Sequence, residues 1–110
     1  MNEVNREVKV YDGSLACPRC GTVDGLHHTE TFVFDRDDGD DNCTVTIVGR
    51  KFTTISRDAE VEIDNPSSYR NGVVILFWCE FCDEPEEVGA KLNISQHKGT
   101  THMYWEDRWQ

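Results

Sequence analysis

One stretch of the sequence, Val73-Val74-Ile75-Leu76-Phe77-Trp78-Cys79-Glu80-Phe81-Cys82, joins six consecutive apolar residues directly to a pair of cysteines. A short continuous apolar run of this kind is typical of a β-strand that is covered on both faces. Two residues between two thiolates allow one tight turn to direct both sulfur atoms at a single point. We therefore expect residues 73–78 to form the central strand of a sheet and to deliver Cys79 to a metal site.

A second pair of cysteines has the same spacing, in Cys17-Pro18-Arg19-Cys20-Gly21. Gly21 is suited to a positive φ after the second thiolate, and Pro18 fixes φ after the first. Asp83 occupies the glycine position of the other pair, and aspartate tolerates the left-handed region better than most residues. Two such turns supply the four sulfur ligands of a tetrahedral zinc site. We therefore predict a structural zinc ion bound by Cys17, Cys20, Cys79 and Cys82.

Three other chemistries are open to these cysteines. Structural disulfides require an oxidising compartment, whereas the chain has five cysteines, an odd number, and its first residues do not read as a signal peptide. A redox pair of the thioredoxin type requires a helix start within a βαβ unit, and no helical periodicity surrounds either pair. Finally, Cys79 and Cys82 together with His97 and His102 have the spacing of a Cys₂His₂ finger.

The finger requires both histidines on one helix, and the sequence around them favours a strand. Apolar and polar residues alternate over residues 91–97, and Gly99 interrupts the interval between His97 and His102. We therefore favour the four-cysteine site and assign no role to the two histidines. The fifth cysteine, Cys43, is expected to be a small buried core residue.

The paired turns resemble the zinc knuckles of the zinc-ribbon group, in which two hairpin turns hold one metal ion beneath a small antiparallel sheet. The resemblance covers Cys17 to Gly21 and Cys79 to Asp83 with their flanking strands, and it implies a metal site without a particular activity. The first turn is also similar to that of rubredoxins, which hold iron for electron transfer, so iron is the alternative metal. Rubredoxins have far fewer residues between their pairs than the 58 found here, which favours zinc.

Three segments are similar to small, mostly uncharacterised four-cysteine proteins of bacterial, phage and mobile-element origin. They are Asn65-Pro66-Ser67, Cys79-Glu80-Phe81-Cys82, and residues 92–100 followed by Trp105. This resemblance implies a bacterial or phage source and assigns no activity to particular residues.

Alternating apolar and polar residues predict strands in the rest of the chain, and no segment has a helical repeat over ten residues. The expected strands are residues 26–34, 43–56, 59–63 and 91–97, and residues 103–109 are expected to form a last short strand or a tail. The first two flank the polar residues 35–42 and are expected to form a hairpin. Because no linker or repeat divides the sequence, we expect residues 1–110 to form one mainly β domain, an antiparallel sheet with a zinc-ribbon-like Cys₄ site and a large insertion between the two knuckles.

The chain is acidic, with 21 Asp and Glu against 11 Lys and Arg and a formal net charge of −10. This balance disfavours binding to nucleic-acid phosphates, which requires clustered basic residues. A basic patch is the alternative if the fold brings Arg50, Lys51 and Arg70 together. No apolar run approaches the roughly 20 residues that span a bilayer. We therefore expect a soluble, cytoplasmic protein without a membrane partner.

The sequence carries no recognisable catalytic motif. A phosphate-binding glycine loop, a nucleophile elbow and a zinc-protease helix are all absent from it, and a closed shell of four cysteines leaves no open coordination position. We therefore expect neither an enzyme nor a small-molecule substrate. The acidic residues 35–42 differ in register from a calcium-binding loop, so a solvated turn is expected there, with weak cation binding as the alternative.

Aromatic residues gather near the carboxyl end, at Tyr104, Trp105 and Trp109. If they are exposed they mark a surface for a protein partner, and if they pack back onto the sheet they belong to the core. The functional hypothesis is an adaptor or inhibitor module that binds another protein through its acidic faces. The alternative is a nucleic-acid-associated zinc ribbon that works within a larger complex.

Overall fold

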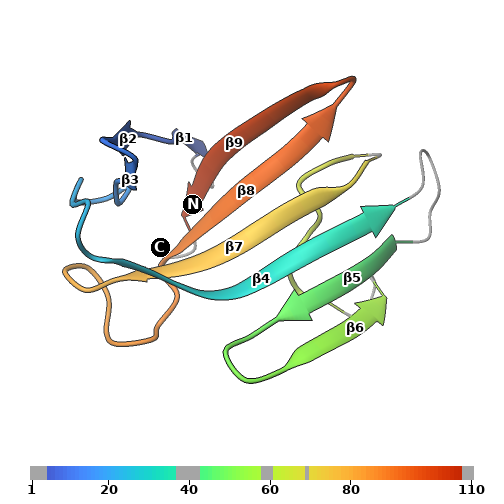
Figure 1. Cartoon of the computed structure of the whole chain (residues 1–110), viewed down its shortest axis with the longest axis horizontal. Helices are drawn as coiled ribbons and strands as arrows, with labels where there is room; N and C mark the ends of the chain where they lie inside the picture. The colour runs from blue at the N-terminus through green and yellow to red at the C-terminus, as the bar shows by residue number, and fades with distance from the viewer. Residues whose placement is uncertain (1–4, 37–42, 58–60, 69, 108–110) are drawn as a thin grey trace.

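The computed structural model describes residues 5–36, 43–57, 61–68 and 70–107, and Figure 1 shows that they form an antiparallel sheet with a small hairpin beside it. Seven strands lie in the order β1-β9-β8-β7-β4-β5-β6, and β2 and β3 form a second, two-stranded sheet. The strands are β1 (Asn5–Glu7), β2 (Val10–Tyr11), β3 (Ser14–Leu15), β4 (Leu26–Arg36), β5 (Cys43–Val48), β6 (Thr53–Arg57), β7 (Gly72–Cys79), β8 (Ala90–His97) and β9 (Thr100–Asp107). The prediction of a mainly β, antiparallel fold is confirmed.

β7 lies in the middle of the large sheet, between β4 and β8, as the apolar run predicts. Val74 and Leu76 belong to one buried cluster, whereas Phe77 belongs to another, against which Ile75 packs. Successive side chains of a strand point to opposite faces of a sheet. The central strand therefore contributes to a core on each of its faces.

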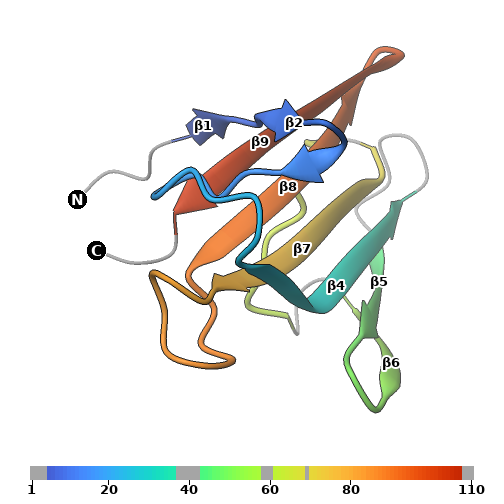
Figure 2. The ribbon, with the colours of Figure 1, turned by 60° about the vertical axis from the view of Figure 1, so that its left-hand side comes forward.

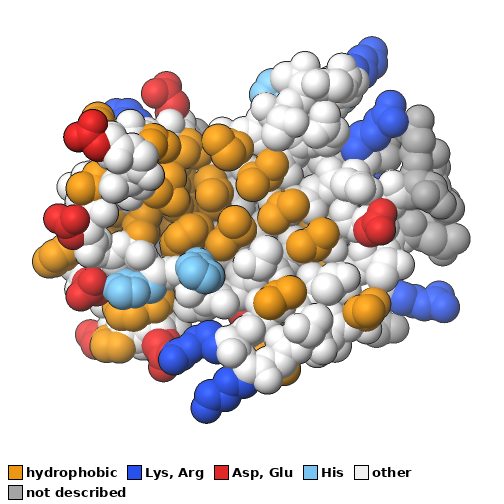
Figure 3. Space-filling view, in the orientation of Figure 1, with side chains coloured by type: hydrophobic (Ala, Val, Ile, Leu, Met, Phe, Trp, Pro, Cys, Tyr) orange, Lys and Arg blue, Asp and Glu red, His pale blue; other side chains and the backbone are white. Residues whose placement is uncertain are grey.

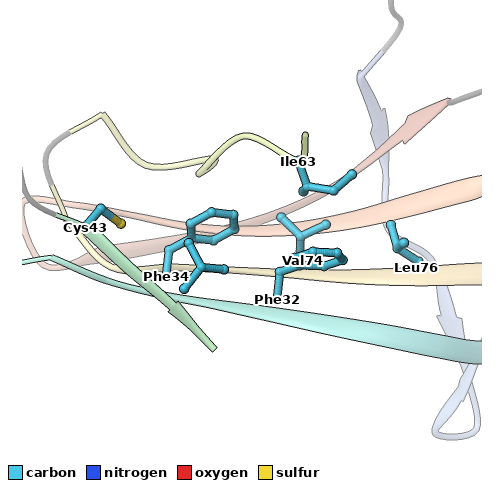
Figure 4. Packing of buried hydrophobic residues seen from close by; sticks show 7 residues of the cluster. Phe32, Phe34, Cys43, Ile63, Val74 and Leu76 are labelled. Carbon is cyan, nitrogen blue, oxygen red and sulfur yellow. The ribbon is translucent and has the colours of Figure 1, made fainter. Parts of the chain in front are cut away.

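The larger core lies between one face of the sheet and the segment that joins β6 to β7, which crosses behind the sheet in Figure 1. Figure 4 shows Ile63 of this segment facing Phe32 and Val74 of the strands. The buried residues of this core are Phe32, Phe34, Cys43, Val45, Ile63, Val74 and Leu76. Cys43 is 5% exposed, which confirms its expected place in the core.

The segment between β6 and β7 is held by side-chain hydrogen bonds rather than by strand pairing. The prediction of a strand over residues 59–63 is wrong for residues 61–63, which are irregular, and residues 58–60 lie outside the described part of the chain. Asn65 Oδ1 accepts the N–H of Ser67 at 3.0 Å, and Ser67 Oγ accepts the N–H of Gln96 in β8 at 2.8 Å. These bonds place an asparagine-initiated turn against the sheet, where Ile63 reaches the core.

The smaller core lies on the opposite face, beneath the amino-terminal segment and the β2–β3 hairpin, as Figure 2 shows. Its buried residues are Phe77, Ala90, Leu92 and Trp105, and Val8, Leu15, Leu26 and Ile75 pack against them. The hairpin turn is formed by Asp12 and Gly13, which both have positive φ. This is the backbone geometry that two-residue hairpins favour.

Trp105 is fully buried in this smaller core. Its ring lies 5.4 Å from the ring of Phe77, in an edge-to-face arrangement at 72°. This burial decides between the two alternatives for Trp105: the carboxyl-terminal strand packs back onto the chain's own sheet, so Trp105 offers no surface to a partner. Tyr104 is half-buried, and Trp109 lies outside the described residues.

Residues 43–56 form two strands instead of the single expected one. β5 and β6 pair with each other after a turn in which the N–H of Gly49 donates to the C=O of Phe52 at 2.9 Å. A Cβ at Gly49 would lie 2.7 Å from the exposed Phe52 ring, so a larger residue at this position would displace that ring. The expected hairpin between residues 26–34 and the strand that starts at Cys43 is confirmed by the pairing of β4 with β5.

Candidate metal centre

The four paired cysteines converge at one end of the sheet. The Sγ atoms of Cys17, Cys20, Cys79 and Cys82 all lie within 4.8 Å of one another, and those of Cys20 and Cys79 are 3.8 Å apart. A tetrahedron with metal–sulfur bonds of about 2.3 Å has edges of about 3.8 Å. The donor set and its spacing therefore fit a tetrahedrally bound metal ion, and the four predicted ligands are brought together.

The first turn follows β3 and has the geometry that the sequence predicts. The N–H of Cys17 donates to the C=O of Thr22 at 2.8 Å, and the N–H of Gly21 donates to the C=O of Cys17 at 3.0 Å. Gly21 has a φ of 79°, a conformation that most other residues adopt only with strain. The turn therefore brings Cys17 and Cys20 to the same side.

The second turn follows β7, and it is closed by hydrogen bonds to the backbone C=O of Cys79. Cys82 and Asp83 donate their N–H groups to this oxygen at 3.2 and 2.9 Å. Asp83 does not take the left-handed conformation of a glycine, because the described non-glycine residues with positive φ are Asp12, Glu86 and Lys98. The suggested backbone role of Asp83 is therefore replaced by a side-chain role.

The side chain of Asp83 joins the two turns to each other. Arg19 donates two hydrogen bonds to its carboxylate, at 2.8 and 2.6 Å, and the N–H of Cys79 donates a third at 2.8 Å. The two charged side chains are only 14% and 10% exposed. The hydrogen bonds and charge of Arg19 lower the pKa of Asp83, so the carboxylate stays ionised in this position.

Gly89 provides the space for this ion pair. Its N–H donates to the C=O of Phe77 at 3.0 Å, which holds it against the second turn. A Cβ at this position would overlap the Asp83 carboxylate and the Arg19 guanidinium. Asp83 and Gly89 are therefore functional residues that the cysteine spacing does not reveal, and the 64 residues that separate Arg19 from Asp83 hide their pairing from any local pattern.

Sheet pairing aligns the two turns. Leu26 of β4 pairs with Cys79 of β7, and the N–H of Glu80 donates to the C=O of Gly25 at 2.9 Å. The chain that leaves the first turn is thus fixed beside the chain that enters the second. Gly25 allows this approach, because a Cβ there would lie 2.9 Å from the ring of Phe81.

The thiols influence one another's protonation. Desolvation of the sulfur raises the pKa of Cys82 to about 12, although the residue as a whole is exposed, and hydrogen bonding to Cys20 and the charge of Cys17 add to this effect. Burial also raises the pKa of Cys79. Burial opposes ionisation of Cys20 as well, but hydrogen bonds from the Thr22 backbone and the neighbouring thiols outweigh it and lower that pKa. Since like charges at this spacing repel one another, a full set of four thiolates requires a cation.

The surroundings of the cluster are acidic on the solvent side. Cys17 and Cys79 are buried, whereas Cys20 and Cys82 are exposed. Exposed carboxylates flank the second turn at Glu80, Glu84 and Glu87. Four thiolates with one divalent cation add two further negative charges, so this end of the sheet is anionic.

The residues of the predicted basic patch do not come together. Arg50 and Lys51 lie in the β5–β6 turn, where Arg50 forms an ion pair with Glu86. Arg70 lies just before β7, near the opposite end of β5. Six extended residues span about 20 Å, so these side chains form no common surface.

The two histidines of the alternative finger lie away from the sulfur cluster. His97 pairs with Thr100 at the β8–β9 turn, and His102 pairs with Ser95; both histidines are exposed. The cysteine cluster is complete without them. Residues 37–42, most of the acidic loop for which weak cation binding is the alternative, lie outside the described part of the chain.

Comparison of the chain with family models, curated proteins and solved structures finds no match. The assignment of the metal centre therefore rests on the four sulfur positions and their surroundings. Among the residues that the structure describes, there is no helix of the length and hydrophobicity needed to cross a membrane.

Proposed function

We propose that this chain is a structural-zinc protein, of bacterial or phage origin, that acts by binding another protein as an adaptor or inhibitor. The observation that carries the proposal is the four-sulfur cluster, because it fits a closed metal shell that stabilises a fold. A bound metal of this kind contributes about 10–16 kcal/mol in zinc-finger peptides. Such a contribution is comparable to the whole stability of a small domain.

Zinc is the proposed metal, with iron as the alternative. The four ligands are all cysteines, and two of them are buried. A shell closed by four protein ligands has no position for water or substrate, so the metal's proposed role is structural rather than catalytic. We propose accordingly that the protein is not an enzyme.

An exposed apolar row supports the proposed protein-binding role. One cross-strand line of residues runs over six strands on the face opposite the 61–68 segment, and Figure 3 shows hydrophobic side chains gathered on this face. Apart from the polar Thr46 of β5, the row is apolar, with Ile55 of β6, Val33 of β4, Val73 of β7, Ile94 of β8 and Met103 of β9. Ile55, Val33 and Met103 are exposed, and the other members are half-buried. Large contiguous apolar patches on soluble proteins mark interaction sites.

Charge indicates the kind of partner. The chain has a net charge of −10, and exposed carboxylates flank its metal end. The proposed partner is therefore a protein with an apolar contact surface and with basic residues on the side that faces the metal end. A nucleic acid fits this surface less well, because Arg50 is paired with Glu86 and lies far from Arg70.

The proposed function is tested with metal analysis and two matched variants. We expect about one zinc ion per chain by elemental mass spectrometry, and iron or no metal would contradict the structural site. Val33→Glu places a charge in the apolar row, whereas Val10→Glu places the same charge on the β2–β3 hairpin, at a position that is 54% exposed. The three proteins then serve as baits in parallel pull-down experiments. A protein that binds the wild type and Val10→Glu but not Val33→Glu supports the proposal.

Two outcomes would contradict this part of the proposal. Equal capture by both variants would exclude the apolar row as the binding surface. Steeply salt-dependent binding of DNA or RNA by the metal-loaded protein would favour the nucleic-acid alternative.

A further inference from the structure

β6 forms an open outer edge of the large sheet. It pairs with β5 along all five of its residues without a register shift. Neither Figure 1 nor Figure 2 shows a described segment beyond it. Alternate N–H and C=O groups of an outer strand point away from the sheet, so β6 presents a row of backbone groups ready to pair with another strand.

The usual devices that block such an edge are missing from β6. The strand reads Thr53-Thr54-Ile55-Ser56-Arg57, without proline, and its single charge lies at its end. Three of these residues are β-branched, a composition that favours extended pairing. At the other edge of the sheet, β1 has only three residues. Short strands, proline, central charges and bulges are how proteins protect their edges, so β6 is the edge that is suited to pairing.

The strand is complementary to a second copy of itself. Ile55 lies at the midpoint of the five residues, with two residues on each side. In an antiparallel pair related by a twofold axis through this point, Ile55 of one copy faces Ile55 of the other, and Thr53 faces Arg57. Twofold interfaces use the same patch on both copies in this manner.

Ile55, the side chain on the proposed twofold axis, would lose exposed apolar surface in such a contact. Ile55 is 69% exposed and ends the apolar row at β6. Directly opposed side chains in an antiparallel pair lie about 5 Å apart at Cβ, so the two isoleucines would cover each other. The two apolar rows would then become continuous across the twofold axis.

The β5–β6 edge carries positive charge within a chain that is acidic as a whole. Residues 43–57 contain three basic residues and no acidic residue, although the chain as a whole is strongly acidic. The two copies of Arg57 would lie four residue spacings apart, about 13 Å. That separation exceeds the Debye length of about 8 Å at physiological salt.

We propose that the protein forms a twofold dimer through antiparallel pairing of β6 with β6 of a second copy, centred on Ile55. A contact limited to five residues per strand buries less surface than the roughly 1,200 Å² that standard stable interfaces bury. The dimer is therefore reversible, and its population depends on concentration.

Analytical ultracentrifugation of the metal-loaded protein tests this dimer. Over about 10 to 500 µM, the wild-type mass is expected to rise from 12.6 kDa for one chain toward twice that value. Ile55→Lys places two like charges opposite each other at the axis and is expected to stay monomeric. Met103→Lys is the matched control, because it changes the same apolar row at a position that is 54% exposed but distant from the β6 edge; it is expected to keep the dimer.

Three results would overturn the proposal: a wild type that is monomeric at every concentration, a dimer that survives Ile55→Lys, and a dimer that both variants abolish equally. The last result would assign the contact to two sheet faces packed against each other. Zinc content and far-ultraviolet circular dichroism equal to those of the wild type establish that each variant folds. None of these measurements uses the partner protein, so the outcome is independent of the proposed function.

Discussion

Replacing Asp83 with alanine would remove three hydrogen bonds from the metal end of the sheet at once. Two come from the Arg19 guanidinium, and the third comes from the N–H of Cys79, itself a metal ligand. The substitution also leaves the guanidinium, which is 14% exposed, without this carboxylate. Removing one partner of a buried ion pair costs about 3–5 kcal/mol. Because this pair is not fully buried, we expect Asp83→Ala to lower the free energy of unfolding by about 3 kcal/mol.

One further substitution separates the contributions to this loss of unfolding free energy, and another serves as its control. Asp83→Asn keeps one acceptor oxygen and the shape of the side chain, so we expect about half of the loss, near 1.5 kcal/mol. Glu80→Gln is the matched control at the same end of the sheet. The Glu80 carboxylate lies 2.8 Å from His27 Nε2, but the two side chains are 49% and 47% exposed. A side-chain contact at such exposure contributes less than about 0.5 kcal/mol.

The assay is urea unfolding at a fixed free zinc concentration, because metal binding adds to the measured stability by mass action. A double-mutant cycle with Arg19→Ala isolates the interaction between the two side chains. We expect a coupling energy of about 1.5–3 kcal/mol. A coupling energy below about 0.5 kcal/mol would refute the claim that this pair joins the two turns.

The other predictions concern the ligands and the space around them. Cys79→Ser is expected to lower zinc content and thermal stability together, whereas Cys43→Ser is expected to leave zinc content unchanged, and equal metal loss in both would refute the ligand assignment. Gly89→Ala is expected to destabilise the protein by about 1–3 kcal/mol, because its Cβ overlaps the Arg19–Asp83 pair; a smaller loss in the Asp83→Ala background would show that the overlap is the cause. Zinc binding is expected to weaken as the pH falls from 8 to 6, because thiols with a raised pKa, such as Cys82 at about 12, must lose protons to bind the metal. Titration calorimetry in buffers of different ionisation enthalpy measures those protons, and a pH-independent affinity would contradict the cysteine site.

The central strand and the metal cluster are predictable because their signals are local. Six apolar residues in succession identify the strand from 73 to 78, and each cysteine pair is visible within four residues. The alternating residues 91–97 likewise predict β8. In the central strand the residues that define the element also supply its burial. In β8 the polar Asn93 is buried as well, at 2% exposed, which the alternation does not reveal.

Other parts of the fold depend on contacts between distant residues. The break between β5 and β6 rests on Gly49 and Phe52, whose ring packs where a side chain at Gly49 would lie. Residues 61–63 read as a strand by their alternation, yet hydrogen bonds of the following Asn65 and Ser67 hold this segment across the sheet without pairing. A periodic pattern reports which side chains are buried, and it does not report what supplies the backbone partners.

The wide separation of the two cysteine pairs in the chain has a consequence for its synthesis. Cys20 precedes Cys82 by 62 residues, and ribosomes add about 5–20 residues per second. For about 3–12 s, therefore, a nascent chain displays the first two thiols before the other two exist. During that interval the first pair can bind a metal only through two sulfur ligands, and it is open to oxidation. The order in which the thiols emerge thus leaves the growing chain sensitive to oxidation until Cys79 and Cys82 have been added.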